Sequence, residues 1–362
     1  MKIYYNLLVV ALLLPFMAVA NTEGPRGKYK AEKKIHKEYE VSPSAALEID
    51  NSYGSIDIVT WNENRTVIDV SITTHANSES KANEKLKEIK VDFTANSSLV
   101  KAVTRFGSEN KSLWSSWFGD NDNVSMEINY TIKIPITNAV DLDNDYGTIR
   151  IDRLEGHARI NCDYGQLIIG ELLADDNYLE FDYTSKSTIQ YMKSGHIDAD
   201  YSGFTLDKVE KLELEADYTS SEIGEVADLD YDCDYGTVKV GKATNVVGRG
   251  DYISNKLGII NGDLNLNTDY GSIIVEKLTA GAKEVVIRSD YTGVKVGFDE
   301  DYTFDFTLNL DYASFKGSDT VEITKSHKDS TEKRYAGYHK TENSGNTVSI
   351  TSDYGGVTFF KN

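Results

Sequence analysis

This chain of 362 residues is poor in the residues on which many enzymes and metal proteins depend. It has two cysteines, four prolines and three tryptophans, and its six histidines are scattered without the spacing of metal ligands. Neither a G-x-S-x-G nucleophile elbow nor a phosphate-binding loop occurs in it. These absences exclude the common sequence signatures of serine hydrolases, nucleotide-binding enzymes and zinc proteins, and we expect no catalytic residues.

Positive charge is outnumbered by negative charge, with 38 Lys and Arg against 58 Asp and Glu, and long apolar runs are scarce. The formal net charge is −20, and such a surface repels nucleic acid and anionic lipid, so neither is an expected partner. After residue 20, no stretch approaches the ~20 apolar residues that a membrane-spanning helix needs. Lys2, an apolar run and the small residues Ala18 and Ala20 predict a secretory signal peptide over residues 1–20. The pattern therefore predicts an exported protein that resides in the periplasm, on the outer surface or outside the cell.

The chain is rich in one dipeptide, Asp-Tyr, which recurs every 17 to 21 residues between residues 145 and 312. A repeat of this length is too short for a domain and is typical of one coil of a solenoid. Tyr53, preceded by serine, opens the series, and Tyr354 closes it after an interruption. The ten regularly spaced tyrosines are Tyr146, Tyr164, Tyr183, Tyr201, Tyr218, Tyr235, Tyr252, Tyr270, Tyr291 and Tyr312.

Apolar residues alternate with polar ones on both sides of each tyrosine. Leu212 and Leu214 precede Tyr218 in this way, and Val238 and Val240 follow Tyr235. A period of two indicates strands with one buried face. The parity changes just after the tyrosine, where glycine or another small residue is common, and glycine permits a positive φ and a close backbone approach. The fold class predicted is all-β, a single-chain parallel β-helix with coils of about 18 residues.

Equal positions of successive coils should lie above one another. We expect the tyrosines to point inward and to stack as a structural ladder; exposed rings would instead form an aromatic platform for sugars. The aspartates are expected to accept backbone N–H bonds within their own corners, as in Asx-turns. The alternative is a calcium column, because oxygen ligands from adjacent coils suit that ion; no other cofactor is expected. The column would consist of Asp217, Asp234, Asp251 and Asp269.

The two cysteines, Cys162 and Cys233, each lie two residues before a repeat tyrosine and four coils apart. Strands stacked at the usual spacing would separate them by ~19 Å. A disulfide requires Cα atoms within about 7 Å. The register therefore predicts two free, buried thiols.

Other segments interrupt the repeats. Residues 21–34 are expected to be flexible, and residues 35–135 to form the first coil and a small α+β cap with a helix over 77–90. A cap is needed because open strand edges invite aggregation. Within it, Trp114, Trp117 and Phe118 form either a partner contact or a hydrophobic plug. Residues 136–362 hold the repeats, with an insertion at about 317–346, read as a hairpin or loop before one last coil.

Three features carry a resemblance to a known family: the segment LEIDNSYGSIDI at 47–58, the strand ending IKIP at 132–135, and the repeated Tyr-Gly corners. Over about residues 35–362 the chain resembles the exported bacterial proteins called putative adhesins, whose function is unknown. The resemblance implies a right-handed parallel β-helix at the envelope of a Bacteroidetes-type bacterium. It supplies no catalytic residues.

Three functional hypotheses follow. The first is a non-catalytic envelope or cell-surface scaffold that binds an unknown protein or glycan. The second is a polysaccharide lyase or glycosidase; a glycosidase needs two carboxylates in different environments, yet here carboxylates recur in every coil. The third is a calcium-stabilised structural spacer. The sequence favours the first, a protein that is not an enzyme.

Overall fold

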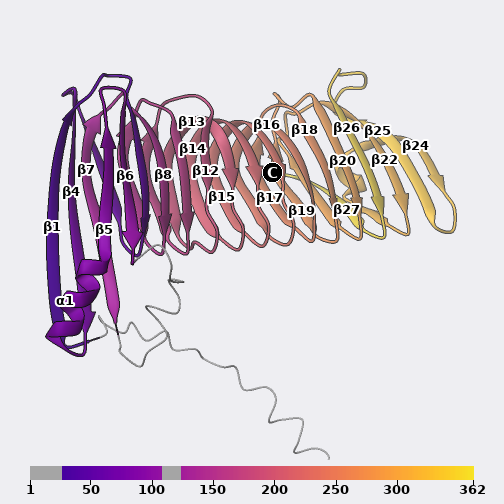
Figure 1. Cartoon of the computed structure of the whole chain (residues 1–362). Helices are drawn as coiled ribbons and strands as arrows, with labels where there is room; N and C mark the ends of the chain where they lie inside the picture. Colours follow the sequence, from indigo (N-terminus) through magenta and orange to yellow (C-terminus); the bar gives the residue numbers. More distant parts are fainter. Residues whose placement is uncertain (1–26, 108–123) are drawn as a thin grey trace, which may run out of the picture.

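The computed structural model describes residues 27–107 and 124–362, which are mostly β-strand and include one α-helix (Figure 1). The prediction of an all-β chain is therefore confirmed. The predicted signal peptide, together with Trp114, Trp117 and Phe118, lies outside the described residues. The strands form one 27-stranded sheet with parallel pairing in its middle and antiparallel pairs toward both ends.

The parallel part consists of repeat units stacked in register (Figure 1). Leu212 in β14 lies opposite Leu229 in β15, which lies opposite Val246 in β16, with an identical step of 17 residues. Equal positions of the repeat therefore lie above one another, as the spacing predicts. The strands are β8 Ala139–Asp145, β9 Thr148–Leu154, β10 Ala158–Asp163, β11 Gln166–Leu172, β12 Asn177–Glu180, β13 Ser187–Asp198, β14 Gly203–Glu215, β15 Ser220–Asp232, β16 Thr237–Asp251, β17 Ser254–Ile260, β18 Leu264–Asp269, β19 Ser272–Leu278, β20 Glu284–Asp290 and β21 Gly293–Phe298.

The core runs through the inside of this stack. Leu214 and Val240, representative of the alternating positions before and after the tyrosines, are both fully buried. Cys162 and Cys233 are buried and free, as the register predicts. Burial raises the pKa of the Cys162 thiol to about 12, so it stays protonated and packs as a small apolar side chain.

At the N-terminal end, the strand pairing changes from parallel to antiparallel. β2 lies between β8 and β6, and β3 lies between β9 and β7. Beyond them β4 runs antiparallel to β7, β1 to β4, and β5 to β6. The elements are β1 Tyr29–Glu40, β2 Ala46–Ser52, β3 Ile56–Trp61, β4 Arg65–Ala76, α1 Glu79–Glu88, β5 Ile89–Ala95, β6 Leu99–Phe106 and β7 Ser125–Pro135.

Two expectations about this end need correction. Residues 29–34, expected to be flexible, belong to β1, which pairs with β4 along its whole length. The sequence does not show the apolar alternation of a strand here, because Ala31 is the only buried residue of β1 and charged side chains occupy both faces. Such charged faces are usual on an edge strand. The helix α1 is shorter than 77–90. Ser78 caps it by accepting a bond from the Lys81 N–H at 3.3 Å, and it ends before Ile89, whose backbone is extended.

At the C-terminal end, the last strands of the chain do not lie last in the stack. β26 lies between β20 and β22, and β27 lies between β21 and β23. The predicted order, with a final coil following Tyr312, is therefore wrong. The end is closed instead by the β24–β25 hairpin, whose strand β25 runs antiparallel to β22. The elements are β22 Phe304–Asp311, β23 Ser314–Lys316, the 3₁₀ turn Ser318–Thr320, β24 Glu322–Lys328, β25 Glu332–His339, β26 Thr347–Asp353 and β27 Gly356–Lys361.

Candidate functional site: an exposed row of tyrosines

Every repeat tyrosine has its backbone in the left-handed region, with φ between 47° and 63°. This conformation costs a residue with a side chain about 1–2 kcal/mol. The expectation that the following glycine supplies a positive φ is wrong, because Gly147 and Gly165 are not among the positive-φ glycines. Glycine is needed there for close approach: a Cβ on Gly147 would overlap the carbonyl oxygen of Gly54. The corner thus needs a left-handed backbone at the tyrosine and, at the residue after it, close approach to the neighbouring backbone.

The tyrosine rings form one continuous stack, here called the tyrosine row. Neighbouring centroids lie 4.7–5.1 Å apart, with ring planes within 2–12° of parallel. Tyr354 lies between Tyr291 and Tyr312, which follows from the position of β26. In spatial order the row is Tyr53, Tyr146, Tyr164, Tyr183, Tyr201, Tyr218, Tyr235, Tyr252, Tyr270, Tyr291, Tyr354 and Tyr312.

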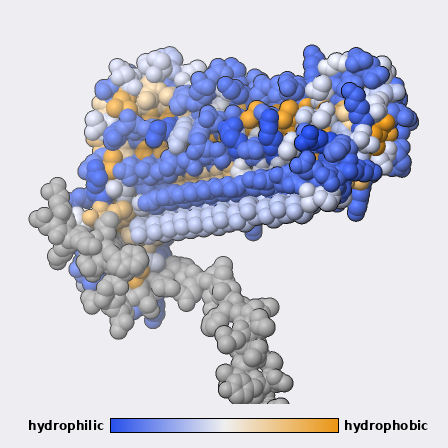
Figure 2. Space-filling model, turned by 90° about the vertical axis from the view of Figure 1, so that its right-hand side faces the viewer, coloured by the Kyte–Doolittle hydropathy of each residue, from blue (hydrophilic) through white to orange (hydrophobic). Residues whose placement is uncertain are grey.

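The row faces outward, which corrects the expectation of inward tyrosines. From Tyr146 to Tyr312 the residues of the row are 47–59% exposed. The left-handed backbone turns each side chain away from the core at the corner, so the alternation pattern does not apply to it. Because the ring faces cover one another, the row offers solvent mainly ring edges and hydroxyls rather than an open platform. Figure 2 shows it as a straight pale band beside a strongly hydrophilic one.

The aspartates next to the tyrosines form a second row. The backbone N–H of Asp217 donates to Oδ1 of Asp200 at 3.0 Å, and the N–H of Asp234 donates to Oδ1 of Asp217 at 3.0 Å. The same bond recurs in other repeats, for example from Asp290 to Asp269 at 2.7 Å. The expected bonds within a corner are therefore replaced by bonds between corners, because in-register stacking brings each carboxylate beside the next repeat.

Of the four aspartates in the predicted calcium column, Asp217, Asp234 and Asp269 each use one carboxylate oxygen in this way. The fourth, Asp251, donates its N–H to Asp234 at 2.6 Å. Among the described residues, the group of three or more His, Cys, Asp or Glu side chains whose possible ligand atoms all lie within 4.8 Å of one another is instead His196, Asp198 and Glu215. The geometry thus assigns the aspartate row a role in hydrogen bonding between repeats.

Packing like charges one repeat apart alters their titration. Burial, followed by the charge of neighbouring carboxylates, raises the pKa of Asp145, Asp182, Asp217, Asp251 and Asp290. The pKa of Asp143 is raised to about 6, first by burial and then by the charges of Asp145 and Asp50. At a pH between the unfolded and the folded pKa of these carboxyls, the folded chain therefore holds protons that the unfolded chain would release.

We expect the protein to become more stable as the pH falls from 7 toward 5. A carboxyl whose pKa is raised on folding contributes its full stability below the unfolded value near 4, and loses it as the pH rises through the folded value. For Asp143 that window runs from about 4 to about 6. The melting temperature should rise by a few degrees over this range, and by less in Asp143→Asn. A melting temperature that falls from pH 7 to pH 5 would contradict the expectation.

Two shallow depressions follow the tyrosine row on the side of the residues that come after it. One, of about 570 Å³, is lined by uncharged residues: Ser202, Tyr218, Thr219, Ser220, Tyr235, Gly236, Thr237 and Tyr252. The other, of about 620 Å³, lies at Tyr53 and Tyr146 and also includes His75, Glu127 and Arg150. The uncharged depression beside Tyr218, Tyr235 and Tyr252 is here called the groove. The depression at Tyr53 and Tyr146 shares no lining residue with it and carries charged side chains.

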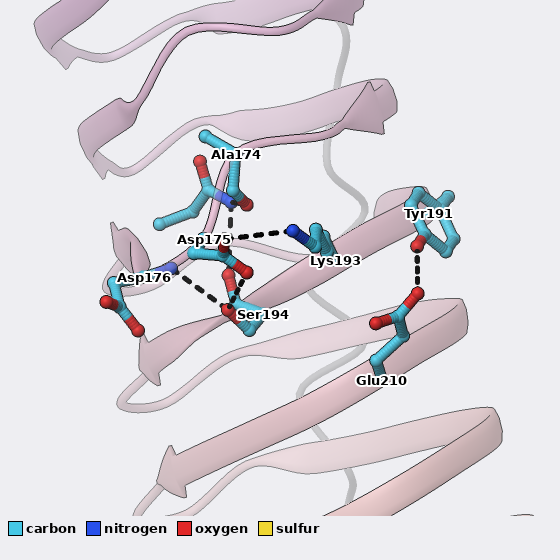
Figure 3. A network of polar contacts seen from close by, with 8 residues as sticks. Ala174, Asp175, Asp176, Tyr191, Lys193, Ser194 and Glu210 are labelled. Atoms are coloured by element: carbon cyan, nitrogen blue, oxygen red, sulfur yellow. Dashed lines mark hydrogen bonds and ion pairs between the residues drawn. The ribbon is translucent and has the colours of Figure 1, made fainter.

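Polar residues elsewhere hold turns together. Lys193 pairs with Asp175 at 2.9 Å, and Ser194 Oγ accepts the Asp176 N–H at 3.0 Å (Figure 3). Tyr191 donates to Glu210 at 2.8 Å (Figure 3). These contacts join the turn before β12 to β13, and β13 to the next repeat. The carboxylates of Asp175 and Glu210 therefore each bond a side chain of an adjacent repeat.

No protein-family model and no curated protein matches this chain. Solved structures similar to it include a putative cell adhesion protein from Clostridium sporogenes, with 10% identity, coverage of 92% of this chain and 100% of that chain, and a TM-score of 0.18. A putative adhesin from Parabacteroides merdae has 9% identity, coverage of 91% and 96%, and a TM-score of 0.31. A putative lipid binding protein from Parabacteroides distasonis has 9% identity, coverage of 90% and 96%, and a TM-score of 0.25.

The expected likeness to proteins described as putative adhesins is thus found among solved structures. At these identities and TM-scores, the proposals below rest on the geometry of this chain's own residues. Within residues 27–107 and 124–362, no helix is long and apolar enough to cross a membrane.

Proposed function

We propose that this chain is an exported, non-catalytic parallel β-helix of the bacterial envelope or cell surface, which binds a protein or glycan partner along its tyrosine row. The in-register parallel pairing of β13 to β16 supports the β-helix. Right-handed winding is proposed because parallel strand crossovers are almost always right-handed. The outward-facing tyrosine row is the observation that carries the binding role.

The size of the row supports a binding surface. Eleven half-exposed tyrosines, from Tyr146 to Tyr312 in spatial order, present roughly 1,100 Å² of side-chain surface, from the area that a tyrosine side chain can bury. Contiguous exposed apolar patches on monomeric proteins rarely exceed a few hundred Å², and larger ones rimmed by polar groups mark interaction sites. The aspartate row supplies such a polar rim.

The rigidity of the row adds a second argument. Each interior ring is already held between two parallel neighbours, so binding would freeze few additional rotamers. Ordering a free side chain at an interface costs about 0.5–1.5 kcal/mol. A partner would therefore meet a preorganised surface. The left-handed strain of each tyrosine also suggests a purpose beyond packing, since strained residues cluster at functional sites.

The binding role is tested by capture from envelope extract with the immobilised mature protein, comparing wild type with Tyr218→Asn/Tyr235→Asn. Asparagine tolerates the left-handed region but removes the rings. We expect the double variant to capture at least tenfold less partner than wild type, while its far-UV circular dichroism spectrum stays unchanged. Tyr29→Asn, an exposed tyrosine in β1 outside the row, is the matched control. Equal capture by all three proteins would argue against the row as the binding surface.

Export is tested separately. After expression of the full chain in a Bacteroidetes host, we expect the protein in the periplasmic, surface or secreted fraction, with Asn21 as its first residue. N-terminal sequencing of the fractionated protein measures this. An uncleaved chain confined to the cytoplasm would refute the export proposal without affecting the binding role.

A further inference from the structure

We infer that the ligand of the tyrosine row is an extended, uncharged polysaccharide with β-1,4-type linkages, which lies along the row and over the groove at Tyr218, Tyr235 and Tyr252, with one sugar beside each repeat. This inference rests on the proposed function and deepens it. It names the class of partner, whereas the proposed function leaves protein and glycan open.

The first argument is the period of the row. Its rings repeat every 4.7–5.1 Å without interruption from Tyr53 to Tyr312. In an extended β-1,4-linked glycan, successive sugars advance by slightly more than one strand spacing and turn over from one sugar to the next. Like faces of the glycan could therefore meet every second ring over several repeats. Same-face side chains of a β-strand repeat at about 6.6–6.8 Å and would leave the register of the rings within about two repeats.

The second argument is the chemistry of the groove. It is lined by three tyrosines of the row and by Ser220 and Thr237, and no lining residue is charged. Thr219 also lines it, but its hydroxyl is hydrogen-bonded to the carbonyl oxygens of Ala199 and Asp217. Hydroxyls can both donate and accept hydrogen bonds, which suits a polymer that itself carries hydroxyls at every unit. The aspartate row on the other side of the tyrosines would repel an anionic polymer.

The third argument is that the hydroxyls are available. In the described part of the chain, the hydroxyls of Tyr218, Tyr235 and Tyr252 have no hydrogen-bond partner, unlike that of Tyr231, which donates to Asn255 at 2.6 Å in the core. Each ring is fixed by stacking, so each hydroxyl is held at a regular position. The groove therefore presents a row of oriented, unused hydrogen-bonding groups.

The experiment measures depletion of the mature protein from solution by insoluble cellulose and chitin, with insoluble amylose and polygalacturonate as comparison polymers. We expect binding to the two β-1,4 neutral polymers, at least tenfold weaker binding to α-linked amylose, and none to the anionic polygalacturonate. Affinity for soluble cello- or chito-oligosaccharides should increase with each added sugar. Equal binding to amylose would overturn the register argument.

The variant Tyr201→Phe/Tyr218→Phe/Tyr235→Phe/Tyr252→Phe keeps the stacked rings and removes four hydroxyls. We expect its Kd for the β-1,4 polymer to rise at least tenfold with no change in melting temperature. Ser220→Ala/Thr237→Ala, which alters the other wall of the groove, should weaken binding as well. The control Tyr29→Phe/Tyr191→Phe changes tyrosines outside the row and should bind like wild type. Undiminished binding by the fourfold variant would overturn the inference.

The inference and the proposed function can fail separately. If no β-1,4 glycan binds but a purified envelope protein is captured in a tyrosine-dependent manner, the glycan inference is overturned and the binding role stands. If neither binds, both are overturned.

Discussion

Gly147→Ala is expected to destabilise the protein by about 3 kcal/mol, at the upper end of the usual cost of overpacking. The added Cβ would overlap the carbonyl oxygen of Gly54 in the preceding repeat. That carbonyl belongs to the backbone and cannot rotate away, so the stack itself must open at this corner. The midpoint of urea unfolding, followed by circular dichroism, measures the loss.

Gly293→Ala is the matched control. Gly293 follows the same kind of corner two residues after Tyr291, yet no atom lies within 4 Å of the position of an added Cβ, and its φ is not positive. We expect a change within about 0.5 kcal/mol. Similar losses for the two variants would show that close approach of the backbone is not what requires glycine at the corner.

Removal of residues 347–362 is expected to unfold the C-terminal part of the stack. β26 and β27 each pair on both sides, so their loss leaves β20 and β22 without a common neighbour. Val348, Ile350, Val357 and Phe359 are fully or almost fully buried, and each contributes about 1.5–3 kcal/mol by burial. The sum is comparable to the whole stability of a typical domain, about 5–15 kcal/mol.

The truncated protein should bind a dye that reports exposed apolar surface, lose its sharp thermal transition and aggregate. A synthetic peptide of residues 344–362, added in trans, should restore the transition by entering the vacant position. Removal of residues 361 and 362 alone, which are exposed and hydrogen-bond to the carbonyl oxygens of Phe298 and Glu276, serves as the control and should have a much smaller effect. An unchanged melting curve for the longer deletion would show that these strands do not stabilise their neighbours.

Much of the fold could be predicted because a strict spacing constrains many positions at once. Leu214, Val240, Cys162 and Cys233 are buried as the repeat register predicts. The direction of the tyrosines could not be deduced from alternation, because a positive φ breaks it. A signal was nevertheless present: Ile253 occupies the position that glycine fills in other repeats, and β-branched residues avoid positive φ. The strain therefore had to lie on another residue of the corner.

Other features leave no local trace in the sequence. The bonds between successive aspartates depend on how neighbouring corners meet, which residue type alone does not specify. The position of β26 is equally hidden, since Tyr354 has the same Asp and Gly neighbours as tyrosines in the middle of the series. The role of Trp114, Trp117 and Phe118, as a partner contact or a hydrophobic plug, stays a prediction because they lie outside the described residues.

The uniform step of 17 residues through β14, β15 and β16 has a consequence for how such a protein can change over evolutionary time. If one unit there is duplicated or deleted, the strands that become neighbours can still pair, because each unit pairs with the next in the same register. Each such event would lengthen or shorten the molecule by about 4.8 Å and leave both terminal closures unaltered. The length of the protein, and the number of ligand subunits it can span, can thus change by one repeat unit at a time.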